Sequence, residues 1–167
     1  QIHLHERGYM IILDIEASSL SEDSYPIEIA WCSLNGQLTY STLINPDTAG
    51  GWEDWDTYAE TEIHGLSREI CCSEGANVVT VVQAAEELLL NSPVFSDAHW
   101  QDQKWLDRLF EAVGKRPPAK LMPLDQAVPP DKRFDLAVRL ATPTRPHRAL
   151  ADCQLLAQIV REVRAGA

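Results

Sequence analysis

Hydrophobic residues in the first part of the chain follow the pattern of three β-strands. Residues 10–17 form an Ile-rich apolar run that is too short for a helix, which indicates a buried strand. Residues 27–34 alternate apolar and polar positions, and residues 37–44 form a third extended run. Asn35 and Gly36, between the last two runs, are typical of a two-residue hairpin turn. The pattern therefore predicts an antiparallel meander of three strands.

A long loop is predicted over residues 48–72, and loops of this length are usually functional or carry a short helix. Helical and extended patterns alternate in the rest of the chain. The predicted elements are helices at 78–90, 103–113, 132–140 and from Pro146 to about Val163, with short strands at 94–96 and 120–124. The order predicts one α/β domain over residues 10–167: a mixed five-stranded sheet, with the meander and parallel strands, flanked by helices. Residues 1–9 are interpreted as an expression remnant or a short leader.

Charge limits the partners that this chain can have. The net charge of −11 argues against a protein that coats long nucleic acid by neutralising phosphates. The charge is uneven, because residues 1–97 carry 2 basic and 17 acidic side chains, whereas residues 98–167 carry 12 basic and 8 acidic ones. A polyanion should therefore approach from the C-terminal half, although solvated helix faces account for most of these cations.

The cysteines and the hydropathy favour a cytoplasmic protein. The four cysteines form no CxxC pair, and Cys71 and Cys72 are adjacent, so that a bridge between them would be strained. Reduced thiols are expected. No apolar run approaches the roughly 20 residues of a membrane helix, and no secretory pattern is present, so no membrane partner is expected.

Four carboxylates that lie beside apolar elements are the candidate chemistry. Asp14 and Glu16 are two apart on the first strand, so they project from one face. Asp102 lies near the start of a predicted helix and Asp152 lies in the last one. Taken singly, each acid has an ordinary explanation, such as a solvated strand end or a helix N-cap, and Asp97 competes with Asp102. Taken together, four acids without matching cations indicate a divalent metal.

His147 is the candidate general base. It follows Pro146, which we expect to place it at the mouth of the last helix, where it could lean over the acids. A neutral imidazole beside metal-bound carboxylates suits the activation of water. Taken alone, a surface histidine is the simpler explanation.

The motifs together resemble the DnaQ-like (DEDDh) superfamily of 3′–5′ exonucleases. Residues 14–20, DIEASSL, resemble its first motif, and residues 147–152, HRALAD, resemble its third, His-x-Ala-x-x-Asp. Residues 97–106, DAHWQDQKWL, are similar to the second motif in the spacing of oligoribonuclease and ribonuclease T. Residues 63–67, IHGLS, look like the His-Gly-Ile-Thr segment of the family. The resemblance covers residues 10–161 and implies a ribonuclease H-like fold.

The resemblance also implies a mechanism. Asp14, Glu16, Asp102 and Asp152 would hold two Mg²⁺ or Mn²⁺ ions about 4 Å apart, and His147 would accept a proton from the attacking water. The implied activity is hydrolysis of phosphodiester bonds from a nucleic-acid 3′ end, with release of 5′-mononucleotides.

Substrate contacts follow from the same resemblance. Ala17, through its backbone, and Leu20 would contact the last nucleotide, with His64 nearby. Ala17 and Ser18 replace two threonines of the family motif and Ser19 replaces a glycine, so contacts to the terminal nucleotide are expected to differ.

Aromatic residues favour single-stranded or short substrates. Trp52, Trp55, Tyr58 and Trp100 could stack on unpaired bases, although we expect at least two of these rings to cover the sheet instead.

Two other functions are compatible with these residues. One is a catalytically silent domain that binds nucleic acid or a protein, against which the intact five-residue set argues. The other is a phosphodiesterase for dinucleotides or small phosphoesters, which suits the negative charge. The sequence leaves DNA and RNA as alternatives, and a homodimer is suggested by analogy only.

Overall fold

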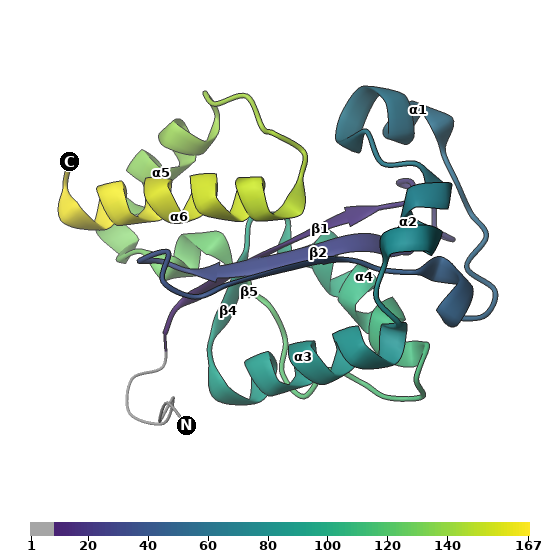
Figure 1. Cartoon of the computed structure of the whole chain (residues 1–167). Helices are drawn as coiled ribbons and strands as arrows, with labels where there is room; N and C mark the ends of the chain where they lie inside the picture. The colour runs from purple at the N-terminus through teal and green to yellow at the C-terminus, as the bar shows by residue number, and fades with distance from the viewer. Residues whose placement is uncertain (1–8) are drawn as a thin grey trace.

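Residues 9–167, which the computed structural model describes, form a five-stranded sheet with helices on both faces (Figure 1). The strands are β1 (Ile11–Ala17), β2 (Pro26–Ser33), β3 (Thr39–Leu43), β4 (Val94–Ser96) and β5 (Met122–Pro123). Their order is β3-β2-β1-β4-β5, with β1, β2 and β3 antiparallel and β4 and β5 added in parallel. This confirms the predicted mixed sheet. The leader or remnant predicted at residues 1–9 falls, apart from Tyr9, outside the described residues.

The helices form two layers and one lateral group. They are α1 (Thr57–Ala59), α2 (Arg68–Glu74), α3 (Val78–Asn91), α4 (His99–Glu111), α5 (Arg133–Leu140) and α6 (Ala149–Ala165), with short turns at Pro46–Thr48, Glu60–His64, Leu124–Ala127 and Pro130–Lys132. Figure 1 shows α5 and α6 on one face of the sheet, α3 and α4 on the other, and α1 and α2 beyond one end. Within residues 9–167, no helix combines the length and the apolar character needed to cross a bilayer.

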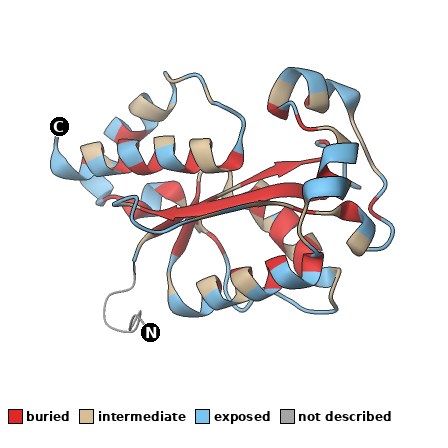
Figure 2. Ribbon diagram, in the orientation of Figure 1, coloured by how far each residue is buried: buried red, intermediate tan, exposed pale blue. Residues whose placement is uncertain are grey.

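The central strand β1 is covered on both faces (Figure 2). Ile11, Leu13 and Ile15 belong to the core that also contains residues of α3 and α4, whereas Ile12 belongs to the core beneath α6. Because side chains alternate along a strand, Asp14 shares the α6 face with Ile12, and Glu16 follows on the same face. The fold thus carries two carboxylates into a region that packing has largely removed from water.

The predicted two-residue hairpin is wrong. Five residues, 34–38, connect β2 to β3, and β3 begins at Thr39 rather than at residue 37. The Asn35 side chain accepts a hydrogen bond from the Gln37 N–H, and the Ser33 hydroxyl accepts one from the Leu38 N–H. These side-chain bonds shape the longer loop beside the backbone bond from the Ser33 N–H to the Leu38 carbonyl oxygen, because Ser and Asn side chains compete for backbone groups.

The predicted start of the last helix is also wrong. Helix α6 begins at Ala149, not at Pro146. His147 has a left-handed backbone with φ of 56°, and Arg148 is extended, so neither can belong to the first helical turn. The segment before α6 therefore forms a bend that presents the histidine.

Candidate active site

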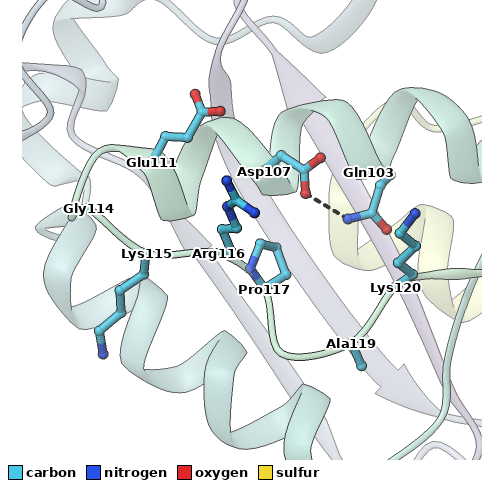
Figure 3. A pocket seen from close by; sticks show the side chains of 9 residues that line it. All are labelled: Gln103, Asp107, Glu111, Gly114, Lys115, Arg116, Pro117, Ala119 and Lys120. Carbon is cyan, nitrogen blue, oxygen red and sulfur yellow. Dashed lines mark hydrogen bonds between the residues drawn. The ribbon is translucent and has the colours of Figure 1, made fainter.

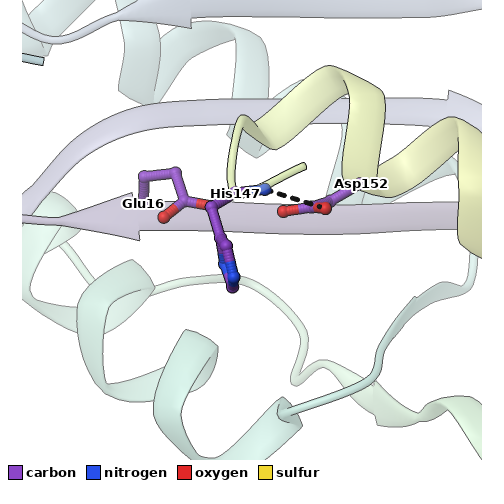
Figure 4. Close-up of side chains that lie close together, drawn as sticks. All are labelled: Glu16, His147 and Asp152. Carbon is purple, nitrogen blue, oxygen red and sulfur yellow. Dashed lines mark hydrogen bonds between the residues drawn. The ribbon is translucent and has the colours of Figure 1, made fainter. Parts of the chain in front are cut away.

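Three of the predicted residues meet beside the end of β1. The ligand atoms of Glu16, His147 and Asp152 all lie within 4.8 Å of one another (Figure 4). Glu16 comes from β1 and Asp152 from the first turn of α6, and both are buried. His147 is exposed at the mouth of the site. The fold thus joins residues that are more than 130 positions apart in the sequence.

Asp14 and Asp102 complete the acidic cluster. Oδ2 of Asp14 is buried and has no hydrogen-bond partner within the described residues. Burial raises the pKa of Asp14 well above its ordinary value, and the charge of Asp102 is the strongest electrostatic contribution in the same direction. Asp102 is buried at the start of α4, where the Ser96 hydroxyl donates a hydrogen bond to its Oδ2.

The cluster has a strong affinity for protons. Burial, reinforced by the charge of Asp152 and a hydrogen bond with it, raises the pKa of Glu16 to about 9. Burial raises the pKa of Asp102 to about 7, and it also raises the pKa of Asp152. Without a cation, these carboxyl groups therefore take up protons instead of sharing the site as anions.

The donors present fit divalent metal. Carboxylate oxygens are the ligands that Mg²⁺ and Mn²⁺ prefer, and the unpartnered Oδ2 of Asp14 is a lone pair that the protein leaves unsatisfied. Glu16 and Asp152 stand close enough for one ion to bind both carboxylates. The arrangement can therefore hold hard cations and, through them, a phosphate oxygen.

The imidazole of His147 is carried by a strained backbone. His147 is the one non-glycine residue with positive φ in residues 9–167, a conformation that costs about 1–2 kcal/mol. Its backbone N–H donates to Oδ1 of Asp152 at 3.3 Å. This bond ties the backbone of the bend to a candidate ligand in the first turn of α6.

Asp97, the competitor of Asp102, is occupied elsewhere. Its Oδ2 lies 2.6 Å from the Nη2 atom of Arg145, which comes from the bend before α6. The Arg145 charge also lowers the pKa values of Asp14 and Asp152, so this guanidinium lies within electrostatic reach of the cluster. The pair links the β4–α4 connection to the segment that carries His147.

The three predicted substrate contacts differ in exposure. Ala17 is buried at the end of β1, whereas Leu20 is 77% exposed in the following loop. His64 is buried, and its Nδ1 accepts a hydrogen bond from the Leu66 N–H. Burial lowers the pKa of His64, so it is neutral at pH 7. The contacts of these residues with a nucleotide stay a prediction.

The loop over residues 48–72 is tied to the turn after β1. The hydroxyls of Ser18 and Ser19, at positions where the sequence departs from the family motif, both donate to Oδ2 of Asp54. The Asp56 N–H donates to the Ser18 carbonyl oxygen at 3.1 Å. These bonds give the two serines a structural role, because they attach the loop to the turn that follows Glu16.

The aromatic residues divide as the sequence predicted. Trp52 is buried and stacks on Tyr25, with ring centroids 5.1 Å apart. Trp55 donates from Nε1 to Glu60 at 2.7 Å and packs against the apolar core. Tyr58 and Trp100 are 65% and 68% exposed, which leaves two rings free to meet a base.

Glu28 and Arg148 belong to the site, and the sequence patterns did not single them out as a pair. Glu28 lies directly opposite Glu16 in the β1–β2 ladder and is buried. Its carboxylate binds the guanidinium of Arg148 through both oxygens. The sequence signal that could have identified Glu28 was its place as an acid on the buried face of β2, two residues before the core residue Ala30.

A separate cavity of about 640 Å³ lies along the outer side of α4 (Figure 3). Its lining includes Gln103, which donates to Asp107 at 2.8 Å, together with Lys115, Arg116 and Lys120. None of the five predicted catalytic residues lines it. We therefore place the chemistry at the acidic cluster and not in this cavity.

Comparisons with known proteins agree with the geometry at the level of the fold. No protein-family model and no curated protein matches the chain. Among solved structures, the nuclease domain of 3′hExo, a DEDDh family member bound to rAMP, is 16% identical with a TM-score of 0.68, and the match covers 96% of this chain and 94% of that one. The fold is that of the DEDDh exonuclease domains.

The same DEDDh fold forms part of larger enzymes. E. coli exonuclease I in complex with a dA13 oligonucleotide is 12% identical with a TM-score of 0.69, and exonuclease I from Methylocaldum szegediense is 14% identical with a TM-score of 0.67. The matches cover 96% and 95% of this chain but only 41% and 40% of those chains. These matches confirm the predicted ribonuclease H-like fold class.

The raised pKa values predict that the metal-free protein loses stability as pH rises. Glu16 titrates near 4.5 when unfolded and near 9 when folded, so between these values the folded state binds more protons than the unfolded state. Stability from this group is therefore present below about pH 4.5 and is lost progressively toward pH 9. We expect the melting temperature in chelator to be higher at about pH 5.5 than at about pH 8.5.

The control for this prediction is Glu16→Gln, which should weaken the pH dependence and leave the part that comes from the other raised acids. Saturating Mg²⁺ should raise the melting temperature more at the higher pH, because the metal binds the deprotonated carboxylates. Equal melting temperatures at both pH values in chelator would contradict the acidic cluster described above.

Asp102→Asn and Asp97→Asn form a matched pair. Asp102→Asn removes a buried charge next to Asp14 while keeping an acceptor for Ser96, so the metal-free melting temperature should be unchanged or higher. The melting temperature of Asp102→Asn should no longer rise in Mg²⁺. Any hydrolysis should slow by about 10²-fold or more. Asp97→Asn should keep the Mg²⁺ response. Thermal melts in chelator and in Mg²⁺ measure both, and the reverse pattern would transfer the ligand role to Asp97.

Proposed function

We propose that the protein is a metal-dependent 3′–5′ exonuclease that releases 5′-mononucleotides from nucleic acid. The observation that carries the proposal is the convergence of Asp14, Glu16, Asp102 and Asp152 with His147 at one end of the sheet, in a DEDDh fold. Their order along the chain is also that of the family motifs. A domain that only binds a partner gains nothing from burying four acids that repel one another.

The four acids are the proposed ligands of divalent metal, as two Mg²⁺ or Mn²⁺ ions. When bound, the metal would polarise the phosphate, lower the pKa of a bound water and stabilise the leaving oxygen. Glu16 and Asp152 would bind the same ion, since their carboxyl groups lie close together. Asp14 would contribute its unpartnered Oδ2, and Asp102 would be oriented by the Ser96 hydroxyl.

His147 is the proposed general base. Its ring stands within 4.8 Å of the Glu16 and Asp152 oxygens, and it is exposed, so it can take a proton from water and pass it to solvent. The bond from its backbone N–H to Asp152 holds the backbone that carries the ring beside the acids.

Single-stranded or short 3′ ends are the proposed substrates. Exposed Leu20, Tyr58 and Trp100 offer apolar surface to unpaired bases, whereas the net charge of −11 disfavours long contacts along a duplex. Several basic residues of the C-terminal half are engaged with their own protein. Lys132 and Arg164, for example, donate to backbone carbonyl oxygens. A cytoplasmic location and a homodimer stay predictions.

The test is hydrolysis of 5′-labelled single-stranded DNA and RNA of several lengths in Mg²⁺ or Mn²⁺. We expect a ladder that shortens from the 3′ end and disappears in chelator. His147→Ala should slow the reaction by about 10²–10⁴-fold, as expected when a general base is lost. His99→Ala, at the start of α4, is the matched histidine control and should retain activity.

The length series separates the exonuclease from its alternatives. Cleavage of dinucleotides alone, with longer chains left intact, would favour the small-phosphoester enzyme. Binding without hydrolysis of any chain would favour the silent domain and contradict the proposal.

A further inference from the structure

Glu28 joins the central sheet to the start of helix α6. Its Oε1 accepts the Ala149 N–H at 2.8 Å, and its Oε2 accepts Nη2 of Arg148 at 2.7 Å. Nε of Arg148 lies 3.1 Å from both carboxylate oxygens. A bidentate pair of this kind fixes direction as well as distance. One buried side chain on β2 therefore holds two consecutive residues of the segment between His147 and Asp152.

Helix α6 depends on this contact at its first turn. Arg148 occupies the N-cap position, and its side chain makes no capping hydrogen bond. The Glu28 carboxylate supplies the missing acceptor from another element and places a negative charge at the positive end of the helix dipole. The helix start is thereby set by the sheet and not by its own sequence.

The same contact fixes the left-handed bend. His147 lies immediately before the two residues that Glu28 binds, and its own N–H bonds to Asp152 in the turn that follows them. If Arg148 and Ala149 were released, His147 could relax from positive φ, and its ring would leave the acids. The bend is therefore held on both sides, by Glu28 and by Asp152.

The bonds from the Glu28 carboxylate to Arg148 and Ala149 form a clamp on the start of α6, and this clamp lies next to the acidic cluster. Glu28 and Glu16 are register partners on adjacent strands, so their side chains share the α6 face. The charge of Glu28 contributes to the raised pKa of Glu16, but Arg148 and the Ala149 N–H bind both Glu28 oxygens. Glu28 is thus held away from metal binding while Glu16 remains available for it.

We propose that Glu28 is a positioning residue, which sets the placement of His147 and Asp152 through Arg148 and Ala149. For the effect on catalysis, the inference rests on the proposed nuclease function. The geometric part, that Glu28 places the His147 ring, is independent of any activity. Arg148, whose side chain is half exposed, acts as the link between them.

The experiment compares Glu28→Gln with Glu162→Gln, a control near the far end of α6 that loses the ion pair of Glu162 with Arg139. Steady-state hydrolysis of a single-stranded oligonucleotide is measured at saturating Mg²⁺ and normalised to the folded fraction. Glu28→Gln should lower kcat by about 10²-fold with KM nearly unchanged, because a shift of about 1 Å in a catalytic group has that effect. Glu162→Gln should leave both values as in the wild type.

Arg148→Gln closes a double-mutant cycle. If both residues act through one clamp, the double variant should be no slower than the slower single variant. If Glu28→Gln fails to fold, Arg148→Gln becomes the test, since Arg148→Gln breaks the same ion pair and keeps the contact of Glu28 with Ala149. Additive losses in kcat would overturn the inference.

The second measurement uses no turnover. The imidazole resonances of His147, assigned with His147→Ala, are recorded by NMR in the metal-free protein. They should shift in Glu28→Gln and stay in place in Glu162→Gln. An unmoved His147 signal in Glu28→Gln would overturn the inference. If the wild-type protein hydrolysed none of the oligonucleotides, the proposed function would be contradicted. The NMR comparison would still test whether Glu28 places the His147 ring.

Discussion

Repulsion among buried carboxylates is the constraint on which the rest of the structure depends. Asp14 and Glu16 lie on a strand that is covered on both faces, and Asp102 and Asp152 come to them from helices on opposite sides of the sheet. Each acid alone costs several kcal/mol to bury as an anion. The cluster is held together because each acid lies on a well-packed element, and local partners such as the Ser96 hydroxyl and the His147 N–H offset part of the cost. Such a site is poised to bind cations.

The start of α6 shows how the fold places chemistry at a point that the local sequence does not favour. A helix that began at Pro146 would have put His147 inside its first turn. The clamp from Glu28 and the bond to Asp152 instead hold a bend with positive φ, which projects the imidazole over the acids. Strain is stored where the proposed base acts, and contacts from β2 and α6 compensate for it.

Arginines mark the boundary between the acidic cluster and solvent. Arg145 pairs with Asp97 and Arg148 pairs with Glu28, so each guanidinium is anchored by an acid that is not a proposed ligand. This arrangement leaves the four candidate ligands without permanent counter-ions. It also keeps positive charge near the acidic cluster, on a protein that is otherwise strongly acidic.

The sequence by itself predicted the meander, the parallel strands and the helices after residue 78, because each of these depends on periodicity, and short motifs selected the candidate acids. Asp14 and Glu16 could be assigned to one face since side chains alternate along any strand. The hairpin after β2 and the start of α6 were predicted wrongly, because side-chain bonds of Ser33 and Asn35 and the distant carboxylate of Glu28 overrode local preference. Only the tertiary structure decided that Asp97 pairs with Arg145, that Ser18 and Ser19 bind Asp54, and that Glu28 caps α6. Those contacts join residues between 35 and 121 positions apart, and no local pattern encodes which of many similar acids meets which partner.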